Sequence, residues 1–148
     1  MLVAFMKQSV IIEKPVEEVF EMATDFNNSP EIMDTVIDVQ LLSEGSVKEG
    51  YRFQETREIR GRKARSIIEV TDFDPNRKYS VRSHQHGLDL RYHYKFVQTS
   101  EGTRIDFQGE LYTEGLRNKL MKPLIRKIIK KEDQDHLQHL KKFIESSS

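Results

Sequence analysis

The feature that most constrains this chain is a long stretch, residues 51–113, in which apolar and polar side chains alternate. A period of two puts successive side chains on opposite faces of a strand, so the stretch predicts antiparallel strands with one dry and one wet face. Short turn sequences interrupt the alternation at Arg60-Gly61, Gly87-Leu88 and Thr99–Gly102, and a longer connection surrounds Asp74-Pro75-Asn76. Such turns join neighbouring antiparallel strands, and we expect four strands in this range.

The turns also predict which residues face each other across the sheet. The three tight turns pair Ile59 with Arg62, His86 with Asp89 and Gln98 with Thr103, while the register at the longer connection is an assumption. An apolar row then crosses the dry face, made up of Phe53, Ile68, Val81, Tyr94 and Phe107. Beside it runs a polar row of Glu55, Ser66, Ser83, Tyr92 and Gly109, followed by Arg57, Ala64, Gln85, Leu90 and Leu111.

The two ends of the chain predict what surrounds these strands. Residues 5–12 alternate like a strand, helix-start signals at Pro15 and Pro30 predict two short helices, and residues 36–42 predict a second strand. The dry face needs a cover, and the C-terminal segment supplies apolar residues at helical spacing: Leu116, Leu120, Leu124, Ile128, Leu137, Leu140 and Ile144. We expect one long helix here, with a kink or a later start at Pro123.

Composition narrows the class of protein. The 24 basic and 24 acidic residues cancel, and this neutral charge argues against nucleic acid as a partner. The absence of cysteine excludes disulfides and thiolate nucleophiles and removes most structural zinc sites. With 148 residues, the length predicts a single domain over residues 1–148, which we expect to be cytoplasmic.

Several segments together resemble a known superfamily. They are Pro15–Phe20, Asp25, Pro30, Val36–Val39, Gly50–Phe53, Glu69–Pro75 and Leu137–Phe143. In these segments the sequence resembles the SRPBCC superfamily (START, Bet v 1-like), especially its bacterial polyketide cyclase/dehydrase-like branch. The resemblance implies an α+β helix-grip fold, in which a curved antiparallel sheet wraps around a long C-terminal helix and two short helices join the first two strands. It also implies a deep cavity for a lipophilic ligand, but no shared catalytic motif.

The residues of the dry face are compatible with such a cavity, independently of the resemblance. A solid core would not gather glutamate, arginine, glutamine and serines, because each buried polar group costs energy unless it is bonded. Either these residues line a solvated pocket, or they lie at an open rim beyond the helix. On the first interpretation, the residues expected to contact a hydrophobic or amphipathic ligand are Phe53, Glu55, Arg57, Ser66, Ile68, Val81, Ser83, Gln85, Tyr92, Tyr94, Phe107, Leu120 and Leu124.

Three of these residues also suggest chemistry. Glu55 and Arg57 share one strand face and are close enough to form a polar clamp on a ligand, an acid–base dyad, or a purely structural ion pair. With Tyr92 they would form the active site of a cyclase or dehydratase. We favour a protein that binds or transports its ligand without changing it, and we assign no catalytic residue. The alternatives are that enzyme and a protein-interaction module.

The histidines and the glycines predict no bound metal or cofactor. The expected pairing puts His84 opposite Arg91 and His93 opposite Arg82 on the wet face, where cationic neighbours oppose metal binding. His86, in the same turn region, adds no further ligand, and we expect all three to be solvated. Glycine-rich phosphate loops are absent from the sequence, which argues against nucleotide cofactors.

Residues 116–131 combine helical apolar spacing with a strong positive charge. They contain seven basic residues and no acidic one. A basic amphipathic helix of this kind can make transient contact with an anionic membrane. The alternative is a solvated helix face whose charge is balanced by the neighbouring Glu132, Asp133 and Asp135.

Overall fold

The computed structural model describes residues 4–147, so residues 1–3 and 148 of the predicted domain lie outside the described residues. The fold is organised around one seven-stranded antiparallel sheet. The strands are β1 (Ala4–Ile12), β2 (Val36–Leu41), β3 (Arg52–Ile59), β4 (Arg62–Asp74), β5 (Lys78–Gln85), β6 (Leu88–Thr99) and β7 (Gly102–Thr113). Their order in the sheet is β1-β7-β6-β5-β4-β3-β2. Residues 51–113 form five strands and not the four expected, because the four connections in this range, the one around residues 74–76 included, join five strands.

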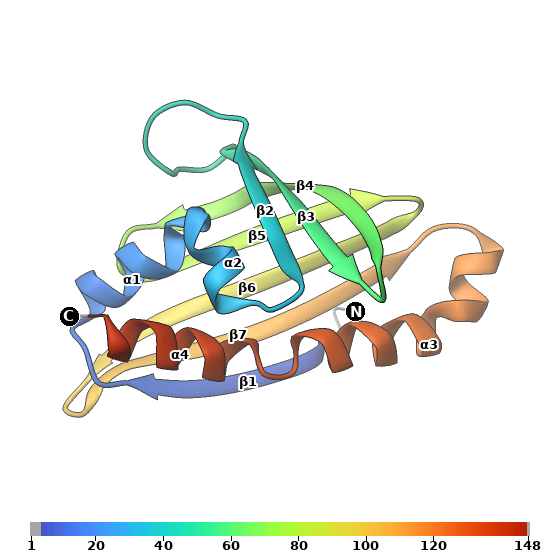
Figure 1. Ribbon diagram of the computed structural model, residues 1–148. Helices are drawn as coiled ribbons and strands as arrows, with labels where there is room; N and C mark the ends of the chain where they lie inside the picture. The colour runs from blue at the N-terminus through green and yellow to red at the C-terminus, as the bar shows by residue number, and fades with distance from the viewer. Residues whose placement is uncertain (1–3, 148) are drawn as a thin grey trace.

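The helices lie along one side of this sheet (Figure 1). Between β1 and β2 come α1 (Val16–Thr24), the short 3-10 helix η1 (Phe26–Asn28) and α2 (Ser29–Ile32). After β7 come α3 (Leu116–Asp133) and α4 (His136–Ser146), and α4 packs against β1 and α2. This arrangement confirms the predicted helix-grip fold. Among the helices within residues 4–147, none is both long enough and apolar enough to cross a bilayer.

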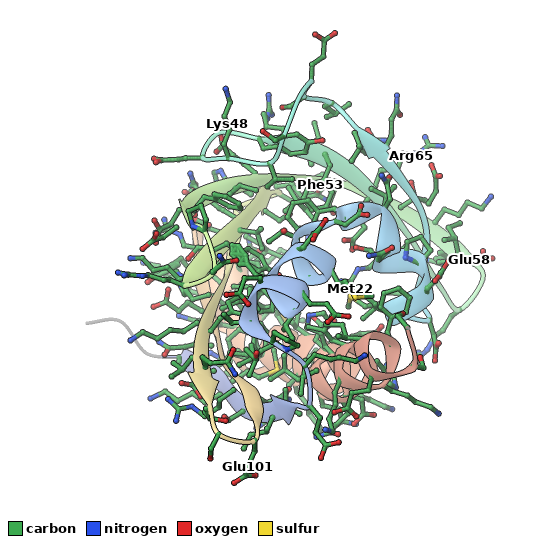
Figure 2. The ribbon with its side chains drawn as sticks, turned by 90° about the vertical axis from the view of Figure 1, so that its left-hand side faces the viewer. Met22, Lys48, Phe53, Glu58, Arg65 and Glu101 are labelled. Carbon is green, nitrogen blue, oxygen red and sulfur yellow. The ribbon has the colours of Figure 1, made fainter. Side chains whose placement is uncertain are left out.

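Alternation along the strands separates a buried face from a solvated one. Figure 2 shows Phe53 pointing into the space between sheet and helices, whereas Arg65 and Glu58 point outward. The buried face packs against apolar residues of α1 and α4. The most deeply buried of these side chains are Ile12, Val19, Val70, Ile105, Phe107, Leu137, Leu140 and Ile144.

Two hairpins differ in register from the prediction, β5–β6 by two residues, and β4–β5 by three residues near its turn and by two beyond a bulge. The β5–β6 turn is centred on His86 and Gly87, both with positive φ, so Gln85 pairs with Leu88. The predicted turn at Gly87-Leu88 was wrong, because a type I′ turn forms one residue earlier, at His86-Gly87. This turn type needs positive φ angles at both central residues, and the turn at Arg60-Gly61 has the same form. A shift of two residues leaves every side chain on its predicted face.

The same shift changes the neighbours of the histidines. Arg82 faces Arg91, His84 faces Asp89, and His93 faces Ser80, so the predicted His–Arg pairs do not form. Between β4 and β5, the turn pairs Asp74 with Lys78 and a bulge lies near residue 71, so Val70, and not Ile68, is the partner of Val81.

The C-terminal segment is two helices and not one. The break falls at Gln134 and Asp135, while Pro123 lies inside α3, which already begins at Leu116. Only the apolar residues of α4 cover the sheet as predicted. The stripe on α3 is exposed, because it lies on a different side of the helix from Ile129 and Asp133, which continue the buried face of α4.

Candidate ligand-binding site

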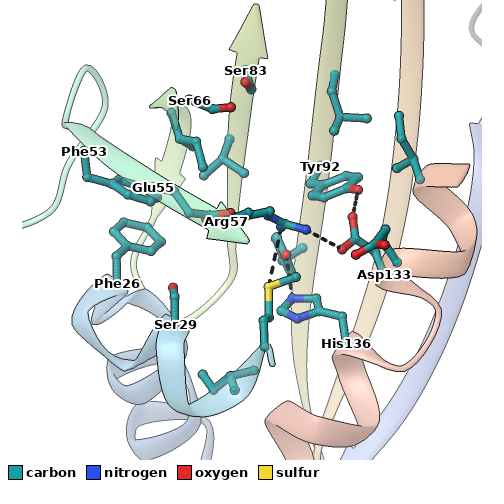
Figure 3. A pocket seen from close by; sticks show the side chains of 18 of the residues that line it. Phe26, Ser29, Phe53, Glu55, Arg57, Ser66, Ser83, Tyr92, Asp133 and His136 are labelled. Carbon is teal, nitrogen blue, oxygen red and sulfur yellow. Dashed lines mark hydrogen bonds and ion pairs between the residues drawn. The ribbon is translucent and has the colours of Figure 1, made fainter. Parts of the chain in front are cut away.

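A cavity of about 300 Å³ lies between the concave face of the sheet and the segments η1, α2, α3 and α4. Strands β3 to β6 supply one wall, and Phe26, Ile32 and Met33 close it from the short helices. The rings of Phe26 and Phe53 stack with centroids 4.3 Å apart, and those of Tyr79 and Tyr94 stack at 4.5 Å. The walls are therefore mostly apolar and aromatic, with a few polar groups among them (Figure 3).

Most of the residues predicted from the sequence are gathered around this cavity. Those that line it are Phe53, Glu55, Arg57, Ser66, Ile68, Val81, Ser83, Tyr92 and Tyr94. They come together because alternate residues of adjacent strands share the concave face.

Four predicted residues do not line the cavity. Gln85 is exposed at the end of β5, next to the turn. Phe107 is buried behind the wall, where its ring packs on those of Tyr92 and Tyr94. Leu120 and Leu124 point away from the cavity, with exposures of 74% and 48%, because the apolar stripe of α3 faces outward.

A network of charged groups crosses the cavity and is centred on Arg57. Its guanidinium donates from Nε to Glu55 at 2.5 Å and from Nη1 to Asp133 at 3.1 Å. Glu55 and Asp133 are almost fully buried, at 7% and 2% exposure. The hydroxyl of Tyr92 donates to the other oxygen of Asp133. The network therefore ties β3 and β6 to the end of α3 (Figure 3).

The backbone at Gly109 allows Tyr92 to take its place in this network. Gly109 pairs with Tyr92 across the β6–β7 ladder. A Cβ atom added at Gly109 would lie 3.1 Å from the Tyr92 ring, closer than side chains normally approach. Because glycine stands there, the ring can lie over β7 while its hydroxyl reaches Asp133.

The network shifts the acidity of its members. Burial lowers the pKa of Arg57, but the carboxylates of Glu55 and Asp133 outweigh burial and hold that pKa above its ordinary value. Burial, and then the neighbouring Asp133 carboxylate, raise the pKa of Tyr92 well above its ordinary value. Arg57 therefore stays charged and Tyr92 stays protonated at neutral pH.

A second polar contact joins β6 to the start of α4. The hydroxyl of Tyr94 and Nε2 of His136 lie 2.8 Å apart. Burial lowers the pKa of His136 to about 4, so the ring is neutral at physiological pH. Its Nδ1 atom is buried, and within residues 4–147 it has no hydrogen-bond partner.

Other polar side chains along the cavity wall also have hydrogen-bonding groups that are not used within the described residues. Within the described part of the chain, no hydrogen bond engages the hydroxyl of Ser66 or Ser83, and Nη2 of Arg57 meets only the sulfur of Met33, at 3.7 Å. These groups, with His136, can donate to or accept from a molecule inside the cavity.

Sequence reasoning missed Asp133 and His136 as members of the site. A signal was present, because Asp133 precedes Leu137 by four residues and Leu140 by seven, which are helical repeats. The buried face of α4, extended backwards, therefore reaches Asp133, and a lone acid on a buried face needs a cationic partner such as Arg57.

The histidines of the outer face lie away from this cavity. His93 contacts Glu110 at 2.6 Å and Ser80 at 2.7 Å, and His84 lies 3.5 Å from Glu114. No cluster of three potential metal ligands occurs within residues 4–147. A second, larger depression of about 660 Å³ is lined mainly by polar and charged residues such as Lys78, His93 and Asp106, so it does not suit a hydrophobic ligand.

Comparison with known proteins identifies the family. Residues 5–145 match the sequence profile of the family described as polyketide cyclase / dehydrase and lipid transport. The chain belongs to this family. No curated protein sequence matches it.

Several solved structures resemble the chain over nearly its whole length. TTHA0849 from Thermus thermophilus has 18% identity and a TM-score of 0.77, covering 97% of this chain and 98% of that one. The Zhui aromatase/cyclase from Streptomyces sp. R1128 has 14% identity and a TM-score of 0.77, over 95% and 92%. A START superfamily protein from Mycobacterium smegmatis has 15% identity and a TM-score of 0.74, over 97% and 98%. At these identities the similarity establishes the fold alone.

Replacing Arg57 with Met should strongly destabilise this family member. The change leaves Glu55 and Asp133 buried without their cation, which costs about 3–5 kcal/mol. The matched control is Arg104→Met, which removes an exposed partner of Asp106 and should cost less than about 1 kcal/mol. Urea unfolding of both variants measures the difference, and equal losses would contradict a buried, essential network.

The stability of the protein should also depend on His136 between pH 6.5 and pH 4. Its pKa is lowered on folding, so the unfolded chain binds the proton more tightly, and the free energy of unfolding falls as the pH drops through this range. The loss amounts to at most about 3 kcal/mol. Denaturant titrations should show a shallower pH dependence for His136→Gln, while His139→Gln, a change at an exposed site on the same helix, keeps the wild-type slope. Identical slopes in wild type and His136→Gln would refute this assignment.

Proposed function

We propose that the chain acts as a single domain that binds, and can transport, a hydrophobic or amphipathic small molecule in the cavity beneath α3. The observation that carries this proposal is the combination of an apolar cavity of about 300 Å³ with polar groups whose hydrogen-bonding capacity is unused. Ligand sites in proteins commonly combine apolar walls with a few orienting polar groups. The family description, which includes lipid transport, supports the same class of ligand.

The charges at the cavity favour a ligand with a neutral polar end. Arg57 is already paired with both Glu55 and Asp133, so the three groups together carry a formal excess of one negative charge. A carboxylate placed beside them would be repelled in a poorly solvated site. A hydroxyl or carbonyl can instead bond to His136, Ser66 or Ser83 without adding charge.

The second candidate function is an enzyme, and the bond between Tyr92 and Asp133 is the observation that favours it. A buried tyrosine hydroxyl beside a carboxylate resembles a proton-transfer pair. However, an efficient acid or base has a pKa near the working pH, and burial raises the pKa of Tyr92 far from it. This direction supports binding over catalysis.

Decanol and decanoate provide a matched test of the ligand's charge. They have the same alkyl chain, so the difference in affinity reports on the polar end alone. We expect decanol to bind at least about tenfold more tightly, because decanoate adds a negative charge near Glu55 and Asp133. Isothermal titration at neutral pH measures both affinities. Equal or tighter binding of decanoate, or no binding of either, would contradict this choice of ligand.

The variant Tyr92→Phe separates a carrier from an enzyme. It removes one hydroxyl and keeps the ring in the cavity wall, so a carrier should lose no more than about tenfold in affinity. An enzyme that uses this hydroxyl should instead lose about 100-fold or more in turnover. The matched control is Tyr112→Phe, which changes a hydroxyl bonded to Glu110 outside the cavity.

The ligand for this comparison is the molecule that co-purifies with the protein from its own host, identified by native mass spectrometry. Titration with this molecule and a search for its reaction products are carried out on wild type and both variants. Conversion by wild type that disappears in Tyr92→Phe at unchanged affinity would rule out the carrier function.

A further inference from the structure

The outer face of α3 carries an apolar stripe that nothing in the described part of the molecule covers. Its residues recur every four positions, which keeps them on one slowly turning side of the helix. The exposed side chains are Leu116 at 75%, Leu120 at 74%, Leu124 at 48% and Ile128 at 53%. Figure 1 shows that the first turns of α3 project beyond the ends of the strands. The stripe therefore adds nothing to the folded core.

The same helix carries an excess of positive charge, because its acidic residues, Glu132 and Asp133, stand together at its C-terminal end. Seven basic residues and no acidic one lie between residues 116 and 131, and among the ion pairs of residues 4–147 none involves any of them. Asp133, the buried acid of this helix, does not neutralise this charge, because its two oxygens accept hydrogen bonds from Arg57 and Tyr92. Lys127 and Lys131 each follow a stripe residue by three positions, so they lie on the apolar side of the helix.

The stripe ends at the mouth of the cavity. Ile59 at the end of β3 and Ile128 on α3 both line the cavity and are exposed, at 36% and 53%, so the opening lies between them. The opposite rim, the β3–β4 turn, is also basic and exposed. Its cationic residues are Arg60, Arg62, Lys63 and Arg65. The mouth is thus bordered by apolar side chains and flanked by positive charge on both sides.

We propose that α3 and the β3–β4 turn form a docking surface for an anionic lipid bilayer, with the cavity mouth facing the lipid. Apolar residues on one face of a basic helix enter the boundary between headgroups and acyl chains, while lysines reach the phosphates along their flexible stems. The positive charge on both rims complements an anionic surface. It also disfavours a second copy of this chain as the occupant, since two such faces would repel each other.

This inference goes beyond the proposed function, and the two can fail separately. Docking is measured on vesicles without any cavity ligand, whereas ligand binding is measured by titration without vesicles. If both hold, the bilayer is the place where the ligand enters and leaves the cavity.

Co-sedimentation of the full chain with vesicles tests the docking surface. The vesicles contain phosphatidylcholine alone or with about 30 mol% phosphatidylserine, and binding should require the anionic lipid and weaken at high salt. Neutralising two cations in Lys127→Gln/Lys131→Gln should weaken binding by about 30-fold. The matched control, Lys48→Gln/Arg77→Gln, neutralises two exposed cations outside both rims and should leave the affinity close to that of wild type.

The apolar stripe is tested with Leu120→Ser/Leu124→Ser, which should weaken binding to the anionic vesicles by at least about tenfold. Its control is Leu41→Ser/Leu42→Ser, at similarly exposed leucines near the end of β2. Thermal unfolding checks that every variant remains folded.

Three results would overturn the proposal. They are equal binding to neutral and anionic vesicles, no binding to the anionic ones, or α3 variants that behave like their controls. A fourth such result would come from light scattering. If the wild-type protein were a dimer and the leucine substitutions made it a monomer, the stripe would be an interface between two copies of the chain.

Discussion

The guanidinium of Arg57 is the group on which the arrangement of sheet, helices and cavity depends. It lies on β3 and bonds both to Glu55 on the same strand and to Asp133 at the end of α3. Two charged carboxylates this deeply buried cost several kcal/mol unless a cation sits between them. Asp133 in turn accepts the hydroxyl of Tyr92, so one charged group connects β3, β6 and α3. A contact of this kind specifies where the helix ends more sharply than apolar packing does.

The cavity exists because the segment that covers the sheet changes character at the helix break. Along α4 the inward residues are Leu137, Leu140 and Ile144, which fill the space above β1 and the adjoining strands. At the end of α3 the inward residue is Asp133, which is short and bound to Arg57. Ile128 and Ile129 of α3 line the space beneath this helix without filling it, and the room remains open to a ligand.

The strands and their faces could be predicted because alternation and tight turns are local signals. The register at His86-Gly87 could not, since a glycine in a two-residue turn fits either a type I′ or a type II′ geometry and the two differ in position. Because these signals are local, most of the cavity lining that comes from the strands followed from the strand pattern, whereas the helical contribution did not. Arg57 and Asp133 are 76 positions apart in the sequence. The only sequence signal for their contact was the spacing of four residues between Asp133 and Leu137, which puts both on the same side of a helix.

The positions of the apolar residues around the helix axis distinguish two apolar sides of the C-terminal segment, one buried and one exposed. Counting back from Leu137 and Leu140 in helical steps reaches Asp133 and then Ile129, both of which line the cavity. The stripe from Leu116 to Ile128 runs along a different side of α3 and is exposed. Exposed leucines contribute little to folding, because their surface stays in water in the folded state as in the unfolded one. The periodicity that predicts a cover for the sheet is therefore satisfied by α4 alone, and the apolar pattern of α3 needs an explanation outside the fold.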